Sequence, residues 1–380
     1  MQSKVYLAEV KTYDEDVIYE KLRWMTEAMG GLEKVLQVPK DARVLLKPNL
    51  VRKADVDRAV MTHPAVMGAV ARLVSEAGYT NIHAGDSCGY GTAAKVMDGT
   101  GMDENLKKYG VKICDFDSGT KVDIGGHRAK QMVLSDEVIE TDALINVCKM
   151  KTHALERVTG AVKNLYGTVY ALNKAKGHTQ YPDAYSFAGM LVDLNHFIGP
   201  KLHIMDGIVA MEGNGPTSGD PVQMNVLLAS TDPVALDTVF CHLIDLKPEL
   251  VPTNVIGTQQ KLGTCHEGDI TIIMPEGESS FEEAVKRFGK ADFNVDRTIK
   301  RQYANWIRML KIFKLFQKKP YIDAKECIHC GICVESCPVE GKALQFKNGR
   351  KEPPVYDYKK CIRCFCCQEM CPHKAIKVKR

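Results

Sequence analysis

The hydrophobic pattern of the first 250 residues alternates between short apolar runs and longer amphipathic stretches. Runs such as VLLK and ALINV lack the polar alternation of a strand with one solvated face, which indicates a parallel sheet covered on both sides. The order of the elements therefore predicts an α/β fold with a mostly parallel layered sheet. We expect strands at 3–10, 43–49, 81–84, 111–116, 143–149, 201–206 and 225–230, and helices at 14–36, 64–77, 184–198 and 232–246.

A different pattern begins near residue 320, where cysteines recur at fixed intervals. Two runs read C-x2-C-x2-C-x3-C-P and are related by a strict shift of 34 residues. Bacterial-type ferredoxins hold [4Fe-4S] clusters with this spacing, and the fourth cysteine of each run ligates the other cluster. We therefore expect two [4Fe-4S] clusters, one on Cys327, Cys330, Cys333 and Cys371, and the other on Cys361, Cys364, Cys367 and Cys337.

Zinc and disulfides are the alternatives for so many cysteines. Zinc sites use paired C-x2-C units, whereas these runs are triplets closed by C-x3-C-P. Disulfides need an oxidising compartment, which nothing in the sequence indicates. Cys366 adjoins Cys367, but the 34-residue shift aligns it with Ile332, so we expect a buried thiol beside the cluster and not a ligand.

Length and charge bound the rest of the organisation. The chain has 380 residues, 45% of them hydrophobic, and its formal net charge of +4 is too small to indicate a nucleic-acid partner. We expect an α/β domain over 1–296, a linker over 297–319 and a small α+β ferredoxin-like module over 320–380. No run of 18 apolar residues predicts a transmembrane span, and residues 1–10 lack the pattern of an export signal. We therefore expect a cytoplasmic protein with oxygen-sensitive, anaerobic redox chemistry.

The linker has an amphipathic and basic pattern. Its apolar residues recur every three or four positions, and the segment carries eight Lys or Arg and no acid. We expect a helix over 297–319 whose apolar face docks on the protein itself. Peripheral contact with a membrane surface, or contact with a partner, is the alternative.

Polar residues follow the predicted strands, and open α/β sheets bind ligands beyond the carboxyl ends of their strands. Lys149, Lys151 and His153 occupy alternate positions after ALINV, which face one way in an extended chain. Together with Lys163 they would favour a small anionic ligand such as a phosphate or carboxylate, so we expect these four residues to be catalytic. A solvated basic loop is the alternative. His178, in the polar stretch KGHTQYPD, is a further candidate for acid–base chemistry.

Other strand ends supply the residues that we expect to bind a ligand or cofactor. The turn GDSCGYG has glycines that would let backbone N–H groups close around an oxyanion, although it matches no established nucleotide-binding spacing. The acidic residues near 206–220 would suit a divalent metal, and a turn satisfied by its own backbone is the alternative. The expected binding residues are Lys47, Asn49, Asp86, Ser87, Asn164, Asp206 and Glu212.

Long motifs of this sequence resemble the domain of unknown function 362 family, which is often fused to a ferredoxin module. The likeness covers roughly residues 3–250 and the C-terminal tail. Cys88 and Cys148 stand where we expect proline in relatives. The resemblance implies an iron-sulfur protein and no particular reaction. The motifs are VLLKPNLV, THPAVMGAVARLV, GDSCGYGT, INVCKMKTHALERVTGAVKNLYG, YPDAYSFAGMLVDLN, LHIMDGIVAMEGNGPTSGDP and LLASTDPVALD.

These features fit two main functions. In the first, the clusters pass low-potential electrons to a small anionic substrate or cofactor in the α/β domain, which would make the protein a ferredoxin-linked oxidoreductase. In the second, the protein is not an enzyme, and its α/β domain docks a redox partner protein to which the clusters deliver electrons. Assembly or storage of iron-sulfur clusters is a third hypothesis.

Overall fold

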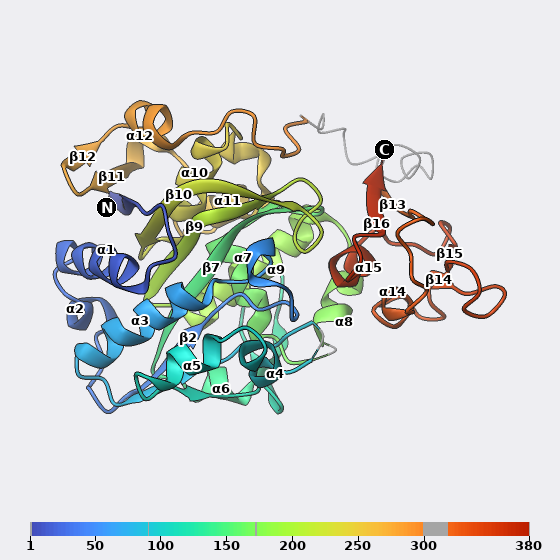
Figure 1. Cartoon of the computed structure of the whole chain (residues 1–380), viewed down its shortest axis with the longest axis horizontal. Coiled ribbons are helices and arrows are strands. Elements are labelled where there is room, and N and C mark those ends of the chain that lie inside the picture. Colours follow the sequence, from blue (N-terminus) through green and yellow to red (C-terminus); the bar gives the residue numbers. More distant parts are fainter. Residues whose placement is uncertain (1, 90, 172, 299–317, 380) are drawn as a thin grey trace.

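The computed structural model describes residues 2–89, 91–171, 173–298 and 318–379. Its α/β part is built around a ten-stranded sheet in the order β12-β11-β1-β10-β9-β7-β2-β3-β4, with β8 paired to β7 (Figure 1). The strands are β1 (Ser3–Glu9), β2 (Arg43–Lys47), β3 (Asn81–Ala84), β4 (Lys112–Ile113), β7 (Ala143–His153), β8 (Arg157–Thr159), β9 (Leu202–Glu212), β10 (Asp220–Ser230), β11 (Ile270–Met274) and β12 (Gly277–Ser279).

The core of the sheet is parallel. Neighbouring strands run parallel from β9 through β7, β2 and β3 to β4, whereas β10 is antiparallel to both β9 and β1. Along the chain, β2, β3 and β4 extend the sheet in one direction, and β7 and β9 extend it in the other. The prediction of a mostly parallel α/β sheet is confirmed, and the strand order reverses between β2 and β7.

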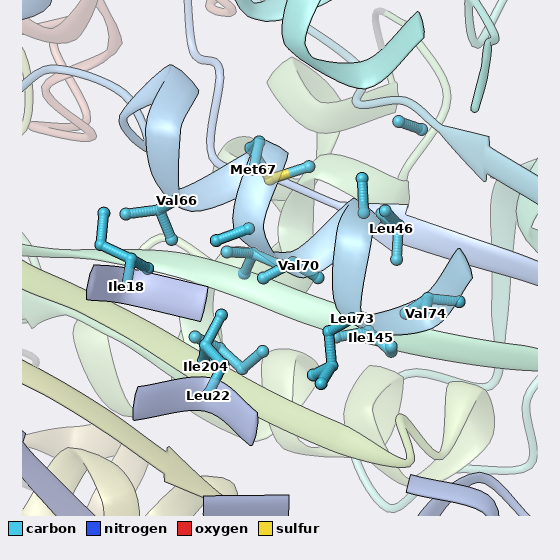
Figure 2. Close-up of a cluster of buried hydrophobic side chains, with 14 of the residues drawn as sticks. Ile18, Leu22, Leu46, Val66, Met67, Val70, Leu73, Val74, Ile145 and Ile204 are labelled. Atoms are coloured by element: carbon cyan, nitrogen blue, oxygen red, sulfur yellow. The ribbon is translucent and has the colours of Figure 1, made fainter. Parts of the chain in front are cut away.

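Helices pack on both faces of this sheet, which explains the continuous apolar runs. Leu46 and Ile145 lie on the face covered by α1 (Glu15–Ala28) and α3 (Pro64–Glu76), in the cluster drawn in Figure 2. Their chain neighbours Leu45 and Leu144 belong to the opposite cluster, with α9 (Ala184–Ile198). Because successive strand residues face opposite sides, a strand buried on both faces must be apolar throughout.

The remaining elements surround this framework. A separate hairpin pairs β5 (Gly119–Asp123) with β6 (Gln131–Ser135). The other helices of the α/β part are α2 (Leu32–Leu36), α4 (Ala93–Asp98), α5 (Met102–Lys107), α6 (Asp136–Ile139), α7 (Ala161–Asn164), α8 (Asn173–Gln180), α10 (Pro233–Leu243), α11 (Pro252–Gln259) and α12 (Phe281–Phe288).

Two predicted elements differ from the structure. The helix expected at 14–36 is two helices, because Gly30 and Gly31 both adopt a positive φ, 98° and 99°, that a continuous helix does not allow. The loop expected between 206 and 225 is mostly strand, since β9 and β10 pair as a long antiparallel hairpin around a short connection at 213–219.

The C-terminal module repeats one small unit. Strand β13 (Lys319–Ile322) pairs with β16 (Ile376–Lys379), and β14 (Leu344–Gln345) pairs with β15 (Val355–Tyr356). Its helices, α14 (Ile332–Glu335) and α15 (Cys366–Met370), begin 34 residues apart, as the cysteine runs do. Most of the helix expected at 297–319 lies outside the described residues, at 299–317. Within the part of the chain that the structure describes, no helix has the length and hydropathy needed to cross a bilayer.

Candidate functional site

The reversal of strand order puts the carboxyl ends of β2 and β7 where open α/β sheets bind ligands. Lys47 ends β2, while Lys149, Lys151 and His153 occupy the last positions of β7. Strand β7 is longer than expected, so these residues belong to the strand itself and not to a loop after it. All four side chains are buried, and the alternative of a solvated basic loop is therefore wrong for this part of the chain.

The charge of the Lys47 ammonium is balanced by a carboxylate of the protein itself. Its Nζ lies 2.9 Å from Asp86 Oδ1, and Asp86 Oδ2 accepts a hydrogen bond from the Leu50 N–H at 2.9 Å. A Cβ on Gly167 would lie 2.0 Å from Asp86 Oδ1, so only glycine lets the chain pass over this pair. The Ser87 N–H donates to Gly167 O at 2.9 Å. The glycine-rich turn thus closes over a lysine–aspartate pair.

A second buried ion pair joins β7 to β9. Lys149 Nζ lies 2.7 Å from Asp206 Oδ2 and donates to the Tyr13 hydroxyl at 2.9 Å. Tyr13 in turn donates to Asp206 Oδ1 at 3.1 Å, and its ring stacks on His63 at 3.4 Å. Burial lowers the pKa of Lys149, and the Asp206 carboxylate opposes that effect.

Lys151 lacks a carboxylate in contact among the described residues. Its Nζ donates to Asn49 Oδ1 at 2.6 Å and to Val60 O at 2.7 Å. Burial, and then the charges of Lys163 and Lys149, lower the pKa of Lys151 well below its ordinary value. Burial and like charges thus favour the neutral form of the Lys151 amine.

Three asparagines continue the contact made by Lys151. Asn49 Nδ2 donates to Asn164 Oδ1 at 2.8 Å, and Asn164 Nδ2 donates to Asn146 Oδ1 at 2.7 Å. Asn146 Nδ2 then lies 2.9 Å from His203 Nδ1. Burial lowers the pKa of His203 to about 3, so its ring is neutral and Nδ1 accepts this hydrogen bond. This series of hydrogen bonds holds the side-chain amides of Asn49 and Asn164 in one orientation.

His153 faces the C-terminal module. Its Nδ1 accepts hydrogen bonds from the N–H groups of Leu155 at 3.2 Å and Glu156 at 3.0 Å, so Nε2 carries the proton and donates to Glu369 Oε1 at 2.7 Å. Burial, and then the Lys163 ammonium, lower the pKa of His153 to about 4. Burial alone would raise the pKa of Glu369, but His153 and Lys163 outweigh it and hold that pKa well below the usual range.

Lys163 differs from the other lysines of the site. It is half-buried, and within the described ranges its ammonium makes no hydrogen bond or ion pair, although its charge acts on Lys151, His153, His178 and Glu369. A cation in that position is available to an anionic ligand.

Two further groups lie beside the site. Lys174, which the sequence pattern did not single out, donates to the carbonyls of Ser87 and Cys88, the latter at 3.1 Å, and burial lowers its pKa to about 8. His178 is buried and stacks on Phe187 at 4.5 Å. Its pKa is lowered to about 4 by burial, so it is a neutral aromatic group.

The acidic residues near 206–220 do not converge. Asp206 pairs with Lys149, Glu212 accepts from the Asn294 N–H at 2.8 Å, and Asp220 pairs with Lys374 of the module at 3.1 Å. The expectation that they share a divalent metal is wrong, because each carboxylate has a separate partner. Glu212 accordingly lies apart from the lysines with which it was grouped.

The C-terminal module docks on the 213–219 connection through helix α15, which Figure 1 places toward the α/β domain. Gln368 Nε2 donates to the carbonyls of Asn214 at 2.8 Å and Gly215 at 3.0 Å. The Thr217 hydroxyl donates to Glu369 O at 2.6 Å. Together with the bond from His153 to Glu369, these contacts hold α15 against the carboxyl end of β7.

The eight expected cluster ligands line two cavities in the module. The first is lined by Cys327, Cys330, Cys333 and Cys371, and the second by Cys337, Cys361, Cys364 and Cys367. Each set takes three cysteines from one run and one from the other.

The spacing of the cysteine sulfurs bears on the zinc alternative. In the described residues, three ligand atoms come within 4.8 Å of one another only at His83, Cys114 and Glu137, where Arg43 pairs with Glu137. The cysteine sulfurs are thus spread more widely than a single tetrahedral zinc allows, since Zn–S bonds of about 2.3 Å bring ligands closer together. The donors fit a cluster better than a zinc ion.

The two remaining thiols near the site have ordinary structural environments. Cys366 is buried and lines neither cavity, and a hydrogen bond with Cys364, followed by burial, raises the pKa of the Cys366 thiol. Burial also raises the pKa of Cys88, so that thiol stays protonated and unreactive.

Two family models match this chain, one within the α/β part and one at the C-terminal module. The domain of unknown function family DUF362 matches residues 44–242. The chain belongs to this family. A 4Fe-4S dicluster domain matches residues 319–372, so this member of the DUF362 family is an iron-sulfur protein.

Relatives are known at the level of sequence and of structure. A thylakoid-associated protein of Synechocystis sp. is 38% identical over 267 residues, which cover 69% of this chain and 80% of that protein. The lactate racemase apoprotein of Thermoanaerobacterium thermosaccharolyticum aligns at 12% identity and a TM-score of 0.43, over 61% of this chain and 55% of that one. A crystal structure from Thermotoga maritima aligns at 12% identity and a TM-score of 0.32, over 59% and 57%. The chain thus spans little more than half of these two solved structures. The cytoplasmic location stays a prediction.

Proposed function

We propose that this DUF362 protein is a two-cluster redox protein that delivers electrons from its C-terminal module to a small anionic substrate or cofactor at the carboxyl edge of the α/β sheet. When bound, two [4Fe-4S] clusters would supply single electrons at low potential. The crossed sets of cysteines around the two cavities would hold them, as each set supplies the four thiolates that one cluster needs.

The observation that carries this proposal is the docking of α15. Cys367, a proposed ligand, lies in this helix, and Glu369 of the same helix contacts His153 at the end of β7. This contact supports the proposal, because it would put an electron donor beside the strand-order reversal, where α/β sheets bind ligands. Carrying both parts on one chain keeps the transfer intramolecular.

The basic residues of the edge divide into two groups. Lys47 and Lys149 are committed to Asp86 and Asp206 and hold the loops in place. Among the residues that the structure describes, Lys163 has no hydrogen-bond or ion-pair partner, so its ammonium would hold the anion by its charge. Lys151 donates to Asn49 and so fixes one wall of the site.

Reoxidation of the reduced protein tests the proposal. The protein, reconstituted anaerobically and reduced, is mixed with phosphorylated and carboxylated metabolites while the absorbance of the reduced clusters is followed. We expect one class of anion to reoxidise the clusters, and Lys163→Met to abolish this reaction. The matched control is Lys176→Met, which removes an exposed lysine of α8 and should leave the reaction unchanged. A reduced protein that no anion binds or reoxidises would contradict the proposal.

The second candidate function is electron delivery to a partner protein without catalysis. The internal pairing of Lys47 with Asp86 and of Lys149 with Asp206 favours it, because these pairs leave fewer charges for a substrate. Reoxidation by an added acceptor protein, with no response to any metabolite, would support this second function over the first.

A further inference from the structure

The two cysteine-lined cavities have unequal surroundings, although the sequence repeats. Cys327 and Cys330 of the first cavity are half-exposed, whereas all four cysteines of the second are buried. Both cavities take a cysteine from the docking helix or its end, since Cys367 lies in α15 and Cys371 follows it. The first cavity is therefore the one with ligands partly open to solvent, and the second is enclosed.

A tyrosine marks the second cavity. The Tyr356 hydroxyl lies 3.2 Å from Cys367 Sγ. The 34-residue repeat places Ile322 at the equivalent position of the first cavity, where it lines the wall and has no polar atom to offer. Of the two equivalent positions, only the one at the second cavity carries a hydrogen-bond donor.

The direction of this hydrogen bond follows from the chemistry of the ligand. Cysteine binds iron as the thiolate, which has no proton to donate, so the phenol is the donor. Pairing with Leu344 of β14 holds the backbone of Tyr356, and its ring stacks on Tyr358 at 5.4 Å.

A hydrogen bond to a cluster sulfur stabilises the reduced cluster more than the oxidised one, because the reduced cluster carries one more negative charge. We propose that Tyr356 raises the reduction potential of the cluster held by Cys361, Cys364, Cys367 and Cys337, and so favours the electron on this cluster over the other. This inference rests on the proposed two-cluster function. Burial works in the opposite direction, since water stabilises added charge, and the hydrogen bond offsets it.

A redox titration followed by electron paramagnetic resonance tests this role in the full-length protein. We expect two one-electron transitions in the wild type, and in Tyr356→Phe one of them moves to a more negative potential while the other stays in place. A tenfold change in the equilibrium constant, about 59 mV for one electron, is the expected order of the shift.

The control is Tyr358→Phe. Tyr358 stacks on Tyr356 at 5.4 Å, but its hydroxyl donates to Pro320 O at 2.8 Å and not to a sulfur. This variant should leave both transitions unchanged. Unchanged potentials in Tyr356→Phe, or equal shifts in both variants, would overturn the inference. A wild type without two titrating clusters would instead refute the proposed function.

Discussion

Replacing Asp206 by asparagine removes the charge of one partner of a buried ion pair and leaves the volume of the side chain almost unchanged. Lys149 is 1% exposed and Asp206 is fully buried, with Nζ and Oδ2 2.7 Å apart. Asp206 also accepts hydrogen bonds from Tyr13 and from the His63 N–H. Asp206→Asn would therefore leave the Lys149 ammonium uncompensated in a place that water does not reach.

The expected loss of stability has an upper bound, because Lys149 is able to lose its proton. Lysine in an unfolded chain has a pKa of about 10.4, so keeping it neutral at pH 7 costs about 4.6 kcal/mol, at about 1.4 kcal/mol for each pH unit. Breaking a buried pair typically costs about 3–5 kcal/mol, and the bound removes the top of that range. We expect Asp206→Asn to lose about 3–4.6 kcal/mol at pH 7.

The same reasoning gives the pH dependence. In the variant, the folded state holds Lys149 neutral while the unfolded state binds a proton below about pH 10.4, so stability rises with pH up to that value. The gap to the wild type should therefore narrow with rising pH, by about 1.4 kcal/mol for each unit over which wild-type Lys149 keeps its proton; burial shortens this range because it lowers the pKa of Lys149.

Anaerobic urea unfolding, followed by circular dichroism at several pH values, measures both effects. The matched control is Asp16→Asn, because Asp16 also lies 2.7 Å from a cation, Arg72, but is 87% exposed. It should lose less than about 1 kcal/mol. A loss below 1 kcal/mol for Asp206→Asn at pH 7, or a gap that does not change with pH, would refute the reasoning.

Three further predictions concern Lys151, the docked helix and the iron. Burial lowers the pKa of Lys151 in the folded protein, so the unfolded chain binds its proton more tightly and this residue makes stability rise with pH below about pH 10.4; Lys151→Met should make that rise less steep, by up to about 1.4 kcal/mol for each pH unit, in urea unfolding. Gln368→Ala should cost about 1–2 kcal/mol of docking and speed amide hydrogen exchange at 213–219 by roughly 5–30-fold, whereas the exposed Gln345→Ala should not. Removal of iron by a chelator should unfold 319–379 and leave the sheet protected from exchange, because thiols make up much of the small core of the module. Protection of 319–379 that survives the loss of iron would contradict this last expectation.

The parts of the fold that follow from local patterns could be predicted from the sequence. Leu45 and Leu46 face opposite sides of the sheet, and a run of such residues indicates a doubly covered strand wherever it occurs. The spacing of the cysteines is equally local. The break at Gly30 was missed because its neighbours keep the helical period, although two consecutive glycines were the available signal.

The partners of the basic residues could not be predicted, since they depend on tertiary contacts. Lys149 meets an aspartate 57 residues away, and His153 meets a glutamate 216 residues away in another part of the chain. Alternation along a strand shows that such groups face one way, but not what lies opposite them. Glu369 gave one signal, its position between two ligand cysteines, and that signal does not point to the α/β domain.

The content of iron and sulfide per chain tests the account most directly. Protein purified anaerobically and reconstituted should hold about eight iron and eight acid-labile sulfide atoms, as two [4Fe-4S] clusters require. Zinc in place of iron, or about four iron atoms that do not increase on further reconstitution, would contradict the account.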